Sequence, residues 1–426
     1  MSFTVASLDA IEILDSRSRP TLQVTIGLGD GTRAVAGVPA GASTGTREAV
    51  ELRDGDPERY AGQGVLRAAA HVREDLARLL GSRAWHSLAD ADRAMEALDG
   101  TGSTSRLGAN AVVGVSLALA RALAASAGAE PYTHLAPEGV TPRLPVPHFN
   151  VLNGGVHAPN PLDFQEFMIA PLGAPSLVEA VRAGAEVYAA LKRLLHARGY
   201  GTGLGDEGGF APDLVQPEDA LRLLVQAIGD AGYTAGREGV ALALDPASSE
   251  FRQGDGTYRV AGESLSSSDM ITRYEAIVAD FPVWSLEDGL AEDDTEGWQE
   301  LTRRLGSRVQ LVGDDNFVTN PALISEAIAA GIANAALIKV NQIGTVTQAL
   351  EAMRLCRENG YAAQISHRSG ETPDPFIADL AVATGCGQMK SGAPARGERV
   401  AKYNRLLEIA HARPELAYGP ARGWEG

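Results

Sequence analysis

Charged residues close a series of short apolar segments in the second half of the chain. The acidic ones follow GVALALD, VWSLED and VQLVGDD, and the basic ones stand in or after AALIK, AAQIS and CGQM. In chain order these residues are Asp245, Glu287, Asp314, Lys339, His367 with Arg368 and Ser369, and Lys390. Any one of them alone is more often a helix cap or a loop residue, but an ordered series indicates a shared site.

Lys339 lies in AALIKVNQIG, a segment that otherwise has the composition of a buried strand. The chain has 37 basic residues, and only four of them are lysine: Lys192, Lys339, Lys390 and Lys402. Arginine keeps its proton at any ordinary pH, whereas a desolvated lysine can release it and act as a base. Lys339 is therefore a candidate for chemistry that arginine cannot perform.

The three carboxylates Asp245, Glu287 and Asp314 end three successive segments. Carboxylates brought together at one point form an oxygen cage for a hard cation, and Mg²⁺ is the expected ion. Soft ligands are absent from the series, which makes zinc or iron a poorer fit. A magnesium site at these segment ends is the prediction.

Three earlier stretches carry further polar groups. The first, GLGDEGGFAP (203–212), holds an acid between glycines that permit close approach to a ligand, and such an acid could donate a proton. The second is NGGVHAPNPLDFQEFMI (153–169), and the third is the Gly-, Ser- and Thr-rich PAGASTGTREAVELRDGD (39–56), a possible lid. Each of them alone is equally well a surface loop. Their candidate residues are Glu207; His157, Gln165 and Glu166; and Ser43.

The elements that position these residues follow an alternating pattern. Short β-branched apolar runs are separated by helical stretches, which is typical of parallel strands joined by crossover helices. The pattern fits a (β/α) barrel, because a doubly wound sheet would normally show a Gly-rich phosphate loop after its first strand. The predicted strands are 166–170, 239–245, 283–288, 309–314, 335–340, 362–366 and 386–390.

The first part of the chain has a different pattern. Alternating segments in 3–14 and 21–38, with the turn Gly29-Asp30-Gly31, predict antiparallel strands. Helical patterns follow in 63–80, 88–98 and 109–127. A stretch rich in Pro and Gly then marks a linker. The predicted domains are an α+β domain at 1–135, a linker at 136–147 and a barrel at 148–426.

Composition excludes several classes of protein. With 45% hydrophobic and 21% charged residues, the chain of 426 residues is not disordered, and its net charge of −17 disfavours nucleic-acid binding. We find no apolar run of roughly 18 residues that predicts a membrane span. The start lacks the features of a signal peptide, and the two cysteines, Cys356 and Cys386, lie far apart. A cytoplasmic location is expected.

Several long motifs resemble those of the enolase (phosphopyruvate hydratase) family. They include GASTGTREAVELRDGD, NGGVHAPN, GDEGGFAPD, LIKVNQIGT, SHRSGET and GQMKSGAPARGERVAKYN, and the resemblance runs nearly end to end. It implies a homodimer or an octamer with an N-terminal α+β domain and a modified (β/α)8 TIM-type barrel. It also implies a carbon–oxygen lyase of glycolysis that converts 2-phosphoglycerate, a small phosphorylated acid, reversibly to phosphoenolpyruvate with two Mg²⁺ ions.

Carried over by residue, the resemblance implies a division of labour. Lys339 is the base that takes the C2 proton, and its pKa must be lowered by several units by desolvation and nearby cations. Mg²⁺ ions and Lys390 stabilise the negative charge of the enediolate, and enzymes of the enolase superfamily generally combine a Lys or His base with one or two Mg²⁺ ions. The resemblance also implies that Glu207 and Glu166 assist as acids, that Asp245, Glu287 and Asp314 hold the first metal, and that Ser43 helps to hold a second metal that arrives with the substrate. It further implies that Arg368 and Ser369 bind the phosphate, that Lys390 binds the carboxylate, and that His157 and Gln165 line the pocket.

The sequence also departs from the family pattern. Where the family has DSRGNPT, this chain has DSRSRPT, with Ser18 and Arg19, and where the family has EDPF, it has EDGL, with Gly289. The family's DCASSEF or DAASSEF is replaced by DPASSEF, with Pro246, and its SGETED is replaced by SGETPDP, with Pro373 and Pro375. These changes leave a second function open: an enolase-like paralogue of secondary metabolism, such as a carboxyphosphonoenolpyruvate synthase of phosphonate-antibiotic biosynthesis. A binding protein without catalysis is a third alternative.

Overall fold

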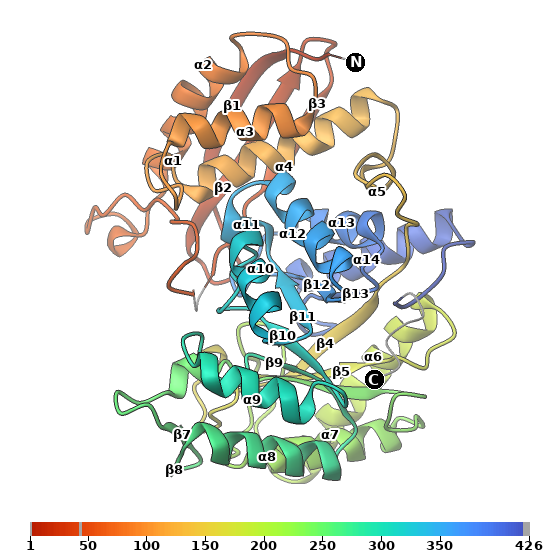
Figure 1. Cartoon of the computed structure of the whole chain (residues 1–426). Helices are drawn as coiled ribbons and strands as arrows, with labels where there is room; N and C mark the ends of the chain where they lie inside the picture. Colours follow the sequence, from red (N-terminus) through yellow and green to blue (C-terminus); the bar gives the residue numbers. More distant parts are fainter. Residues whose placement is uncertain (1, 42–44, 421–426) are drawn as a thin grey trace.

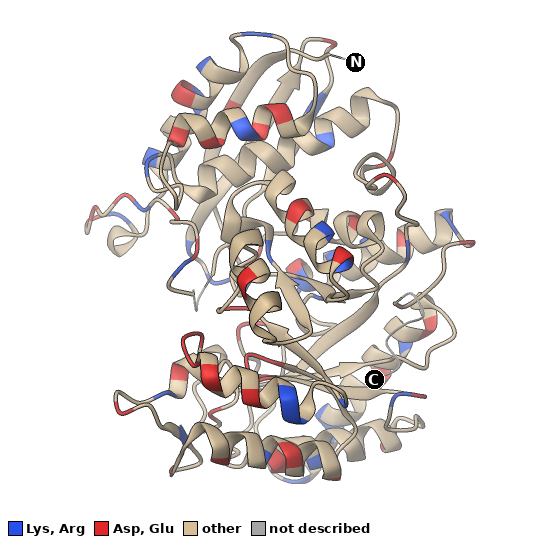
Figure 2. Ribbon diagram, viewed as in Figure 1, with Lys and Arg blue, Asp and Glu red and all other residues tan. Residues whose placement is uncertain are grey.

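The computed structural model describes residues 2–41 and 45–420, so Ser43 lies outside the described residues. The described chain forms an N-terminal part and a barrel that lie against each other (Figure 1). Acidic and basic residues are interspersed over both parts in the view of Figure 2. The expected division at 1–135, 136–147 and 148–426 stays a prediction.

The N-terminal part is built on a three-stranded sheet. Strands β1 (Val5–Leu14), β2 (Pro20–Leu28) and β3 (Arg33–Gly37) are antiparallel and lie in chain order. The predicted turn joins β2 to β3, and Gly31 has φ +92°, a conformation that suits glycine. The prediction of antiparallel strands is confirmed here.

Helices cover this sheet. The helix α4 (Ala109–Ser126) packs on β2 and β3 and is long and apolar enough to cross a membrane, contrary to our reading of the sequence. Because 78% of its apolar window is buried inside the protein, it is a core helix. The predicted helix at 63–80 contains a π-helical turn at Val72–Leu76. The other helices are α1 (Leu66–His71), α2 (Ala77–Leu80), α3 (Leu88–Asp99) and α5 (Pro131–His134).

Eight strands close into a barrel. All seven predicted strands are present, and the eighth, β4, was missed. Its sequence VPHFNVLN is fully buried, but a proline and three polar residues interrupt the apolar pattern that would have revealed it. The strands are β4 (Val146–Asn153), β5 (Glu166–Ala170), β6 (Ala241–Asp245), β9 (Val283–Glu287), β10 (Gln310–Gly313), β11 (Ala335–Ile338), β12 (Ala362–Ser366) and β13 (Gln388–Lys390).

The prediction of parallel pairing throughout is wrong for β5, which runs antiparallel to both β4 and β6. A connection without a long helix joins β4 to β5, so the chain turns straight back on itself. Two helices, α6 (Leu177–Ala197) and α7 (Pro217–Asp230), then join β5 to β6, and an antiparallel helix pair again reverses the strand direction. The remaining pairs are parallel, so the barrel is a modified (β/α)8 fold.

The later strands alternate with outer helices, as the sequence pattern predicts. A short hairpin of β7 (Tyr258–Val260) and β8 (Glu263–Leu265) follows β6. The helices after it are α8 (Ser267–Asp280), α9 (Thr295–Leu305), α10 (Pro321–Ala330), α11 (Val340–Ile343), α12 (Val346–Glu358), α13 (Phe376–Thr384) and α14 (Gly397–Ala412).

The N-terminal part reaches the barrel mouth through its loops. Ala40 pairs with Gly370 in an isolated bridge, and Ala49 N donates to the carbonyl of Gln342 at 2.9 Å. Asp92 of α3 accepts a 3.2 Å hydrogen bond from the backbone of Thr347 at the start of α12. These contacts fix the two parts relative to each other next to the strand ends.

Candidate active site

Each barrel strand brings its site residue to one mouth. In the parallel strands this is the carboxyl end, where the side chains named by the sequence stand. Because β5 runs the other way, its first residue, Glu166, pairs in register with Asp245 and joins the same mouth. One small cavity is lined by most of these groups. Its lining includes His157, Gln165, Glu166, Glu207, Asp245, Asp314, Lys339, Arg368, Ser369 and Lys390.

Lys390 stands at the centre of the carboxylates. Its Nζ lies 2.6 Å from Glu287 Oε1, 3.2 Å from Asp245 Oδ2 and 3.4 Å from both carboxylate oxygens of Glu166. Burial alone lowers the pKa of Lys390, but these three acids together raise it well above its usual range. Lys390 is therefore held as a positive charge among these acids.

Lys339 follows β11, and its side chain is 13% exposed. Its Nζ forms a hydrogen bond and an ion pair with Asp314 Oδ2. Burial lowers the pKa of Lys339, but the Asp314 carboxylate outweighs burial and raises the pKa above its usual value. The expected lowering includes bound cations that neutralise this carboxylate, and it stays a prediction.

A layer of buried groups holds Asp314 in place. Gln342 Nε2 donates to Asp314 Oδ1 at 2.9 Å, and Thr319 donates to Gln342 Oε1 at 2.7 Å. Asp288 accepts from the backbone N–H groups of Asp314 and Asp315 at 2.9 and 3.0 Å. These contacts fix both the side chain and the backbone of the acid that pairs with Lys339.

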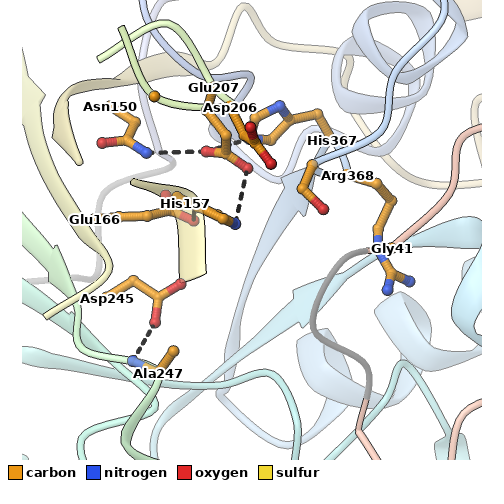
Figure 3. A network of polar contacts seen from close by, with 12 residues as sticks. Gly41, Asn150, His157, Glu166, Asp206, Glu207, Asp245, Ala247, His367 and Arg368 are labelled. Atoms are coloured by element: carbon orange, nitrogen blue, oxygen red, sulfur yellow. Dashed lines mark hydrogen bonds and ion pairs between the residues drawn. The ribbon is translucent and has the colours of Figure 1, made fainter. Parts of the chain in front are cut away.

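Glu207 lies in the loop between α6 and α7, as the glycine pattern suggested. Its Oε2 accepts a 2.9 Å hydrogen bond from Asn150 Nδ2 and lies 3.2 Å from His367 Nε2. Burial raises the pKa of Glu207, but His367 and His157 outweigh burial and hold the pKa well below its usual range. Figure 3 shows these three side chains around Glu207.

His157 lies between the two acids of this side of the cavity. Its Nδ1 is 3.9 Å from Glu166 Oε1, and its Nε2 is 3.9 Å from Glu207 Oε1. Burial lowers the pKa of His157 and raises the pKa of Glu166 well above normal, with the Glu207 charge adding to the second effect. One acid is thus held as the neutral carboxyl group while its neighbour is held ionised, an arrangement suited to proton transfer.

The expected phosphate ligands lie at the opposite wall. Arg368 Nη1 donates to Glu48 Oε2 at 2.9 Å and to Asn341 Oδ1 at 3.2 Å. The hydroxyl of Ser369 accepts from Arg17 at 3.4 Å, so two guanidinium groups reach this wall. Gln165 is buried, and its Oε1 has no hydrogen-bond partner among the described residues, so it is available to a ligand.

The donors at the mouth fit a hard cation. Asp245, Glu287 and Asp314 offer only oxygen, and Glu287 Oε2 is buried with no hydrogen-bond partner among the described residues. Among the described residues, two sets of side chains have ligand atoms within 4.8 Å of one another, and neither is the predicted set of Asp245, Glu287 and Asp314. They are His157, Glu166 and Glu207, and Asp288, Asp314 and Asp315. Asp314 belongs to the second set, so the cation could draw on more acids than the three predicted.

Two departures from the family motifs lie beside expected metal ligands. Pro246 follows Asp245 and has no N–H, but the donor to Asp245 Oδ1 is the next residue, Ala247, at 2.9 Å. Proline is therefore compatible with this hydrogen bond. Gly289 stands where the motif has proline, and a Cβ there would meet the side chains of Leu286 and Leu301 at 3.1 and 3.2 Å. Neither change removes a site contact.

Sequence reasoning missed several residues that shape the site. Asn150 lies in β4, the strand that was not predicted, and His367 was noted only as a strand end. Arg399, on α14, stood inside the recognised motif GQMKSGAPARGERVAKYN but was given no role. Asp288 and Gln342 stood inside recognised motifs but were given no role. Only tertiary contacts reveal what these five residues do.

Comparisons with known proteins agree with this geometry. Residues 5–135 match the family described as "Enolase, N-terminal domain", and residues 141–418 match "Enolase, C-terminal TIM barrel domain". The chain belongs to the enolase family. It is 55% identical over 414 residues to an enolase of Rubrobacter xylanophilus, covering 97% of this chain and 96% of the relative. It is 49% identical over 416 residues to an enolase of Helicobacter hepaticus, covering 97% of each.

Membership of this family makes the chain an enzyme, a carbon–oxygen lyase of the phosphopyruvate hydratase type. The predicted fold class, an N-terminal α+β domain followed by a modified (β/α)8 barrel, is confirmed. Both relatives carry the name of the glycolytic enzyme, and the comparisons do not favour the alternative of a phosphonate-pathway paralogue.

Proposed function

We propose that this site dehydrates 2-phosphoglycerate reversibly to phosphoenolpyruvate, the glycolytic reaction of the family. The observation that supports this most strongly is the meeting of Lys339, Lys390 and Glu207 in one cavity ringed by carboxylates. A base, a fixed cation and an acid are the three groups that this elimination needs. They come from β11, β13 and the loop between α6 and α7.

The first step is removal of the C2 proton by Lys339. That proton is very weakly acidic, because its loss adds a second negative charge beside the substrate carboxylate. Lys390 supplies a positive charge where this charge develops, and its location between Glu287 and Asp245 keeps it there. Lys339 acts as a base in its uncharged form, released from its pair with Asp314.

The second step breaks the C3–O bond. The electron pair left at C2 forms the C2–C3 double bond, and the C3 hydroxyl leaves as water. Because Glu207 is ionised at rest and Glu166 is held as the neutral carboxyl group, the proton comes from Glu166 and reaches the hydroxyl through Glu207. In the reverse direction the same groups add water across the double bond.

Magnesium is the proposed cofactor, with Asp245, Glu287 and Asp314 holding the first ion and Ser43 contributing to a second that arrives with the substrate. When bound, Mg²⁺ supplies positive charge that stabilises the negative charge on the substrate carboxylate and phosphate. The all-oxygen donor set and the unpartnered Glu287 Oε2 support this choice of metal.

The remaining residues bind the substrate. Arg368 and Ser369 hold the phosphate, and Lys390 holds the carboxylate. His157 and Gln165 line the pocket. Arg368 already has a carboxylate partner in Glu48 of the N-terminal part, so phosphate binding must share or displace this pair. The site therefore joins both parts of the chain to the substrate.

The test is direct. Purified protein is mixed with Mg²⁺ and 2-phosphoglycerate, and the absorbance of phosphoenolpyruvate is followed. We expect a signal that requires both the metal and the substrate. Absence of a signal at high protein concentration, with turnover of a phosphonate-pathway analogue instead, would refute the proposed reaction.

We also propose a homo-oligomer, either a dimer or an octamer, in the cytoplasm. Ile11 and Leu14 of β1 are 50% and 55% exposed, and Val35 of β3 is 43% exposed, so the N-terminal sheet carries uncovered apolar side chains. Both cysteines are free, which suits a reducing compartment. Light scattering of the purified chain measures its mass and distinguishes a monomer, a dimer and an octamer.

A further inference from the structure

Arg399 is a fully buried cation that the proposed reaction does not use. It lies near the start of α14 and is 0% exposed. Its Nη1 contacts His367 Nδ1 and donates to the carbonyl of Arg368 at 2.6 Å. Its Nη2 donates to the carbonyls of Ser369 at 2.6 Å and Asp206 at 3.2 Å. The guanidinium thus touches both loops that carry the acid side of the site.

The contact with His367 dictates where that ring carries its proton. A guanidinium has N–H donors and no acceptor, and it keeps its charge at any ordinary pH. The Nδ1 atom that faces Arg399 must therefore be the unprotonated acceptor. The single proton of a neutral ring is then on Nε2, and burial supports the neutral ring by lowering the pKa of His367 to about 3.

His367 Nε2 lies 3.2 Å from Glu207 Oε2. Asn150 donates to that same oxygen at 2.9 Å. Because Asn150 donates to Oε2 and the Nε2 proton of His367 lies close to the same oxygen, a proton that passes through Glu207 is carried on the other oxygen, Oε1. Oε1 is the oxygen on the side of His157, which also lines the cavity.

We propose that Arg399 is a positioning residue: by fixing the tautomer of His367, it directs the transferable proton of Glu207 to Oε1, toward the leaving hydroxyl. The inference rests on the proposed function, in which Glu207 is the acid. With the other tautomer, Nε2 would be a bare acceptor. It would then draw the Glu207 proton onto Oε2, away from the substrate.

The test must separate this role from a merely structural one, because Arg399 also binds three backbone carbonyls. The reaction offers a built-in comparison. Exchange of the C2 hydrogen with solvent deuterium depends on the base Lys339, whereas formation of phosphoenolpyruvate also depends on Glu207. Both rates are measured on the full chain with Mg²⁺ and 2-phosphoglycerate, by NMR and by absorbance.

We expect R399K to slow dehydration about 10²-fold, in the range of a lost acid contribution, while C2 exchange stays within about threefold of wild type. R396K is the matched control. Arg396 binds the carbonyls of Ser16 and Gly205 beside the same loops but does not contact His367. We expect R396K to leave the ratio of the two rates unchanged. An equal fall of both rates in R399K, or no fall, overturns the proposal.

Two further measurements test the proposal even if the R399K variant does not fold. In the wild-type chain, ¹⁵N NMR should show His367 with bare Nδ1 and protonated Nε2; the opposite tautomer overturns the proposal. In an H367Q background the amide donates without a tautomer, so adding R399K should reduce dehydration less than threefold further. A full additional loss would show a role independent of His367. If wild-type protein does not dehydrate 2-phosphoglycerate at all, the proposed function fails, whereas the tautomer measurement still tests the Arg399 contact.

Discussion

The two sides of the active site are built in different ways. The base side consists of charges that face one another directly: Lys390 among Glu166, Asp245 and Glu287, and Lys339 on Asp314. The acid side has two carboxylates, Glu166 and Glu207, and Glu207 is surrounded by the amide of Asn150 and the imidazoles of His157 and His367. The base side thus controls how much charge is present, and the acid side controls in which direction a single proton points.

Chain topology explains this difference. The base side comes from residues at the ends of neighbouring barrel strands, where short-range geometry brings them together. The acid side assembles from segments that are distant in the chain: β4, the loop after α6, the loop after β12, and α14. Direct charge contacts are strong without fine orientation, whereas a directed hydrogen bond requires several elements to agree.

The largest expected effect is on the base side. K339A should abolish C2 exchange and lower turnover by about 10³-fold or more, because the proposed base is removed. The chain should keep its fold, as judged by circular dichroism. K192A, at an exposed site on α6, is the control and should behave like wild type. Undiminished exchange in K339A would rule out this lysine as the base.

A substitution on the acid side should affect dehydration but not C2 exchange. E207Q keeps the shape and the hydrogen-bond acceptor at Oε1 or Oε2 but cannot give a proton. We expect dehydration to fall about 10²- to 10³-fold while C2 exchange continues, because Lys339 is untouched. The ratio of the two rates, measured in deuterated buffer, is the readout. If C2 exchange stops as well, removal of the C2 proton and departure of the hydroxyl do not depend on separate groups of residues.

Mg²⁺ binding to the carboxylates of the base side should stabilise the folded chain. At about one hundred times its dissociation constant, Mg²⁺ should stabilise the wild-type fold by about 2.7 kcal/mol, because it binds carboxylates that only the folded chain brings together. D245N should lose most of this gain, and D280N, at an exposed position on α8, should keep it. Thermal unfolding with Mg²⁺ and with a chelator measures both. An equal gain in D245N would place the metal elsewhere.

The stability of the acid side should depend on pH through His367. Its pKa falls from 6.5 to about 3 on folding, chiefly because of burial, so protons bind the unfolded chain first as the pH is lowered. The associated stability is complete above pH 6.5 and is lost progressively toward pH 3, and the loss is about 2 kcal/mol at pH 5. H367Q should lack this part of the loss in denaturant titrations at pH 7 and 5. If the free energy of unfolding changed equally with pH in wild type and H367Q, His367 would not be the cause of the loss.

The smallest effect concerns a turn beside the acid side. Ser18 has φ +60°, in the left-handed region, and it replaces the glycine of the family motif. Its neighbour Ser16 contacts Arg399, so the turn supports the acid side without touching substrate. S18G should raise the free energy of unfolding by about 1 kcal/mol with little change in turnover. S18A is the control, and an equal gain there would remove backbone strain as the cause.

Local pattern predicted most of the fold. Seven barrel strands, the antiparallel N-terminal strands and the barrel class were readable because apolar periodicity and turn residues act over a few residues. The strand β4 escaped because three of its buried side chains are polar and form contacts that a sequence does not display. The reversed direction of β5 escaped because pairing direction depends on connections in space, not on the strand itself.

The same division holds for the site. The sequence by itself determined which groups are candidates for the chemistry, since Lys339, Lys390, Glu207 and the acids at the strand ends lie in recognisable positions and motifs. Only the tertiary structure decided their charge states and orientations. Without bound cations the pKa of Lys339 is raised because Asp314 faces it directly, and the Glu207 proton has a direction only because Arg399 reaches His367 from α14. Electrostatic interactions and hydrogen bonds depend on distance in space, and distance along the chain does not specify it.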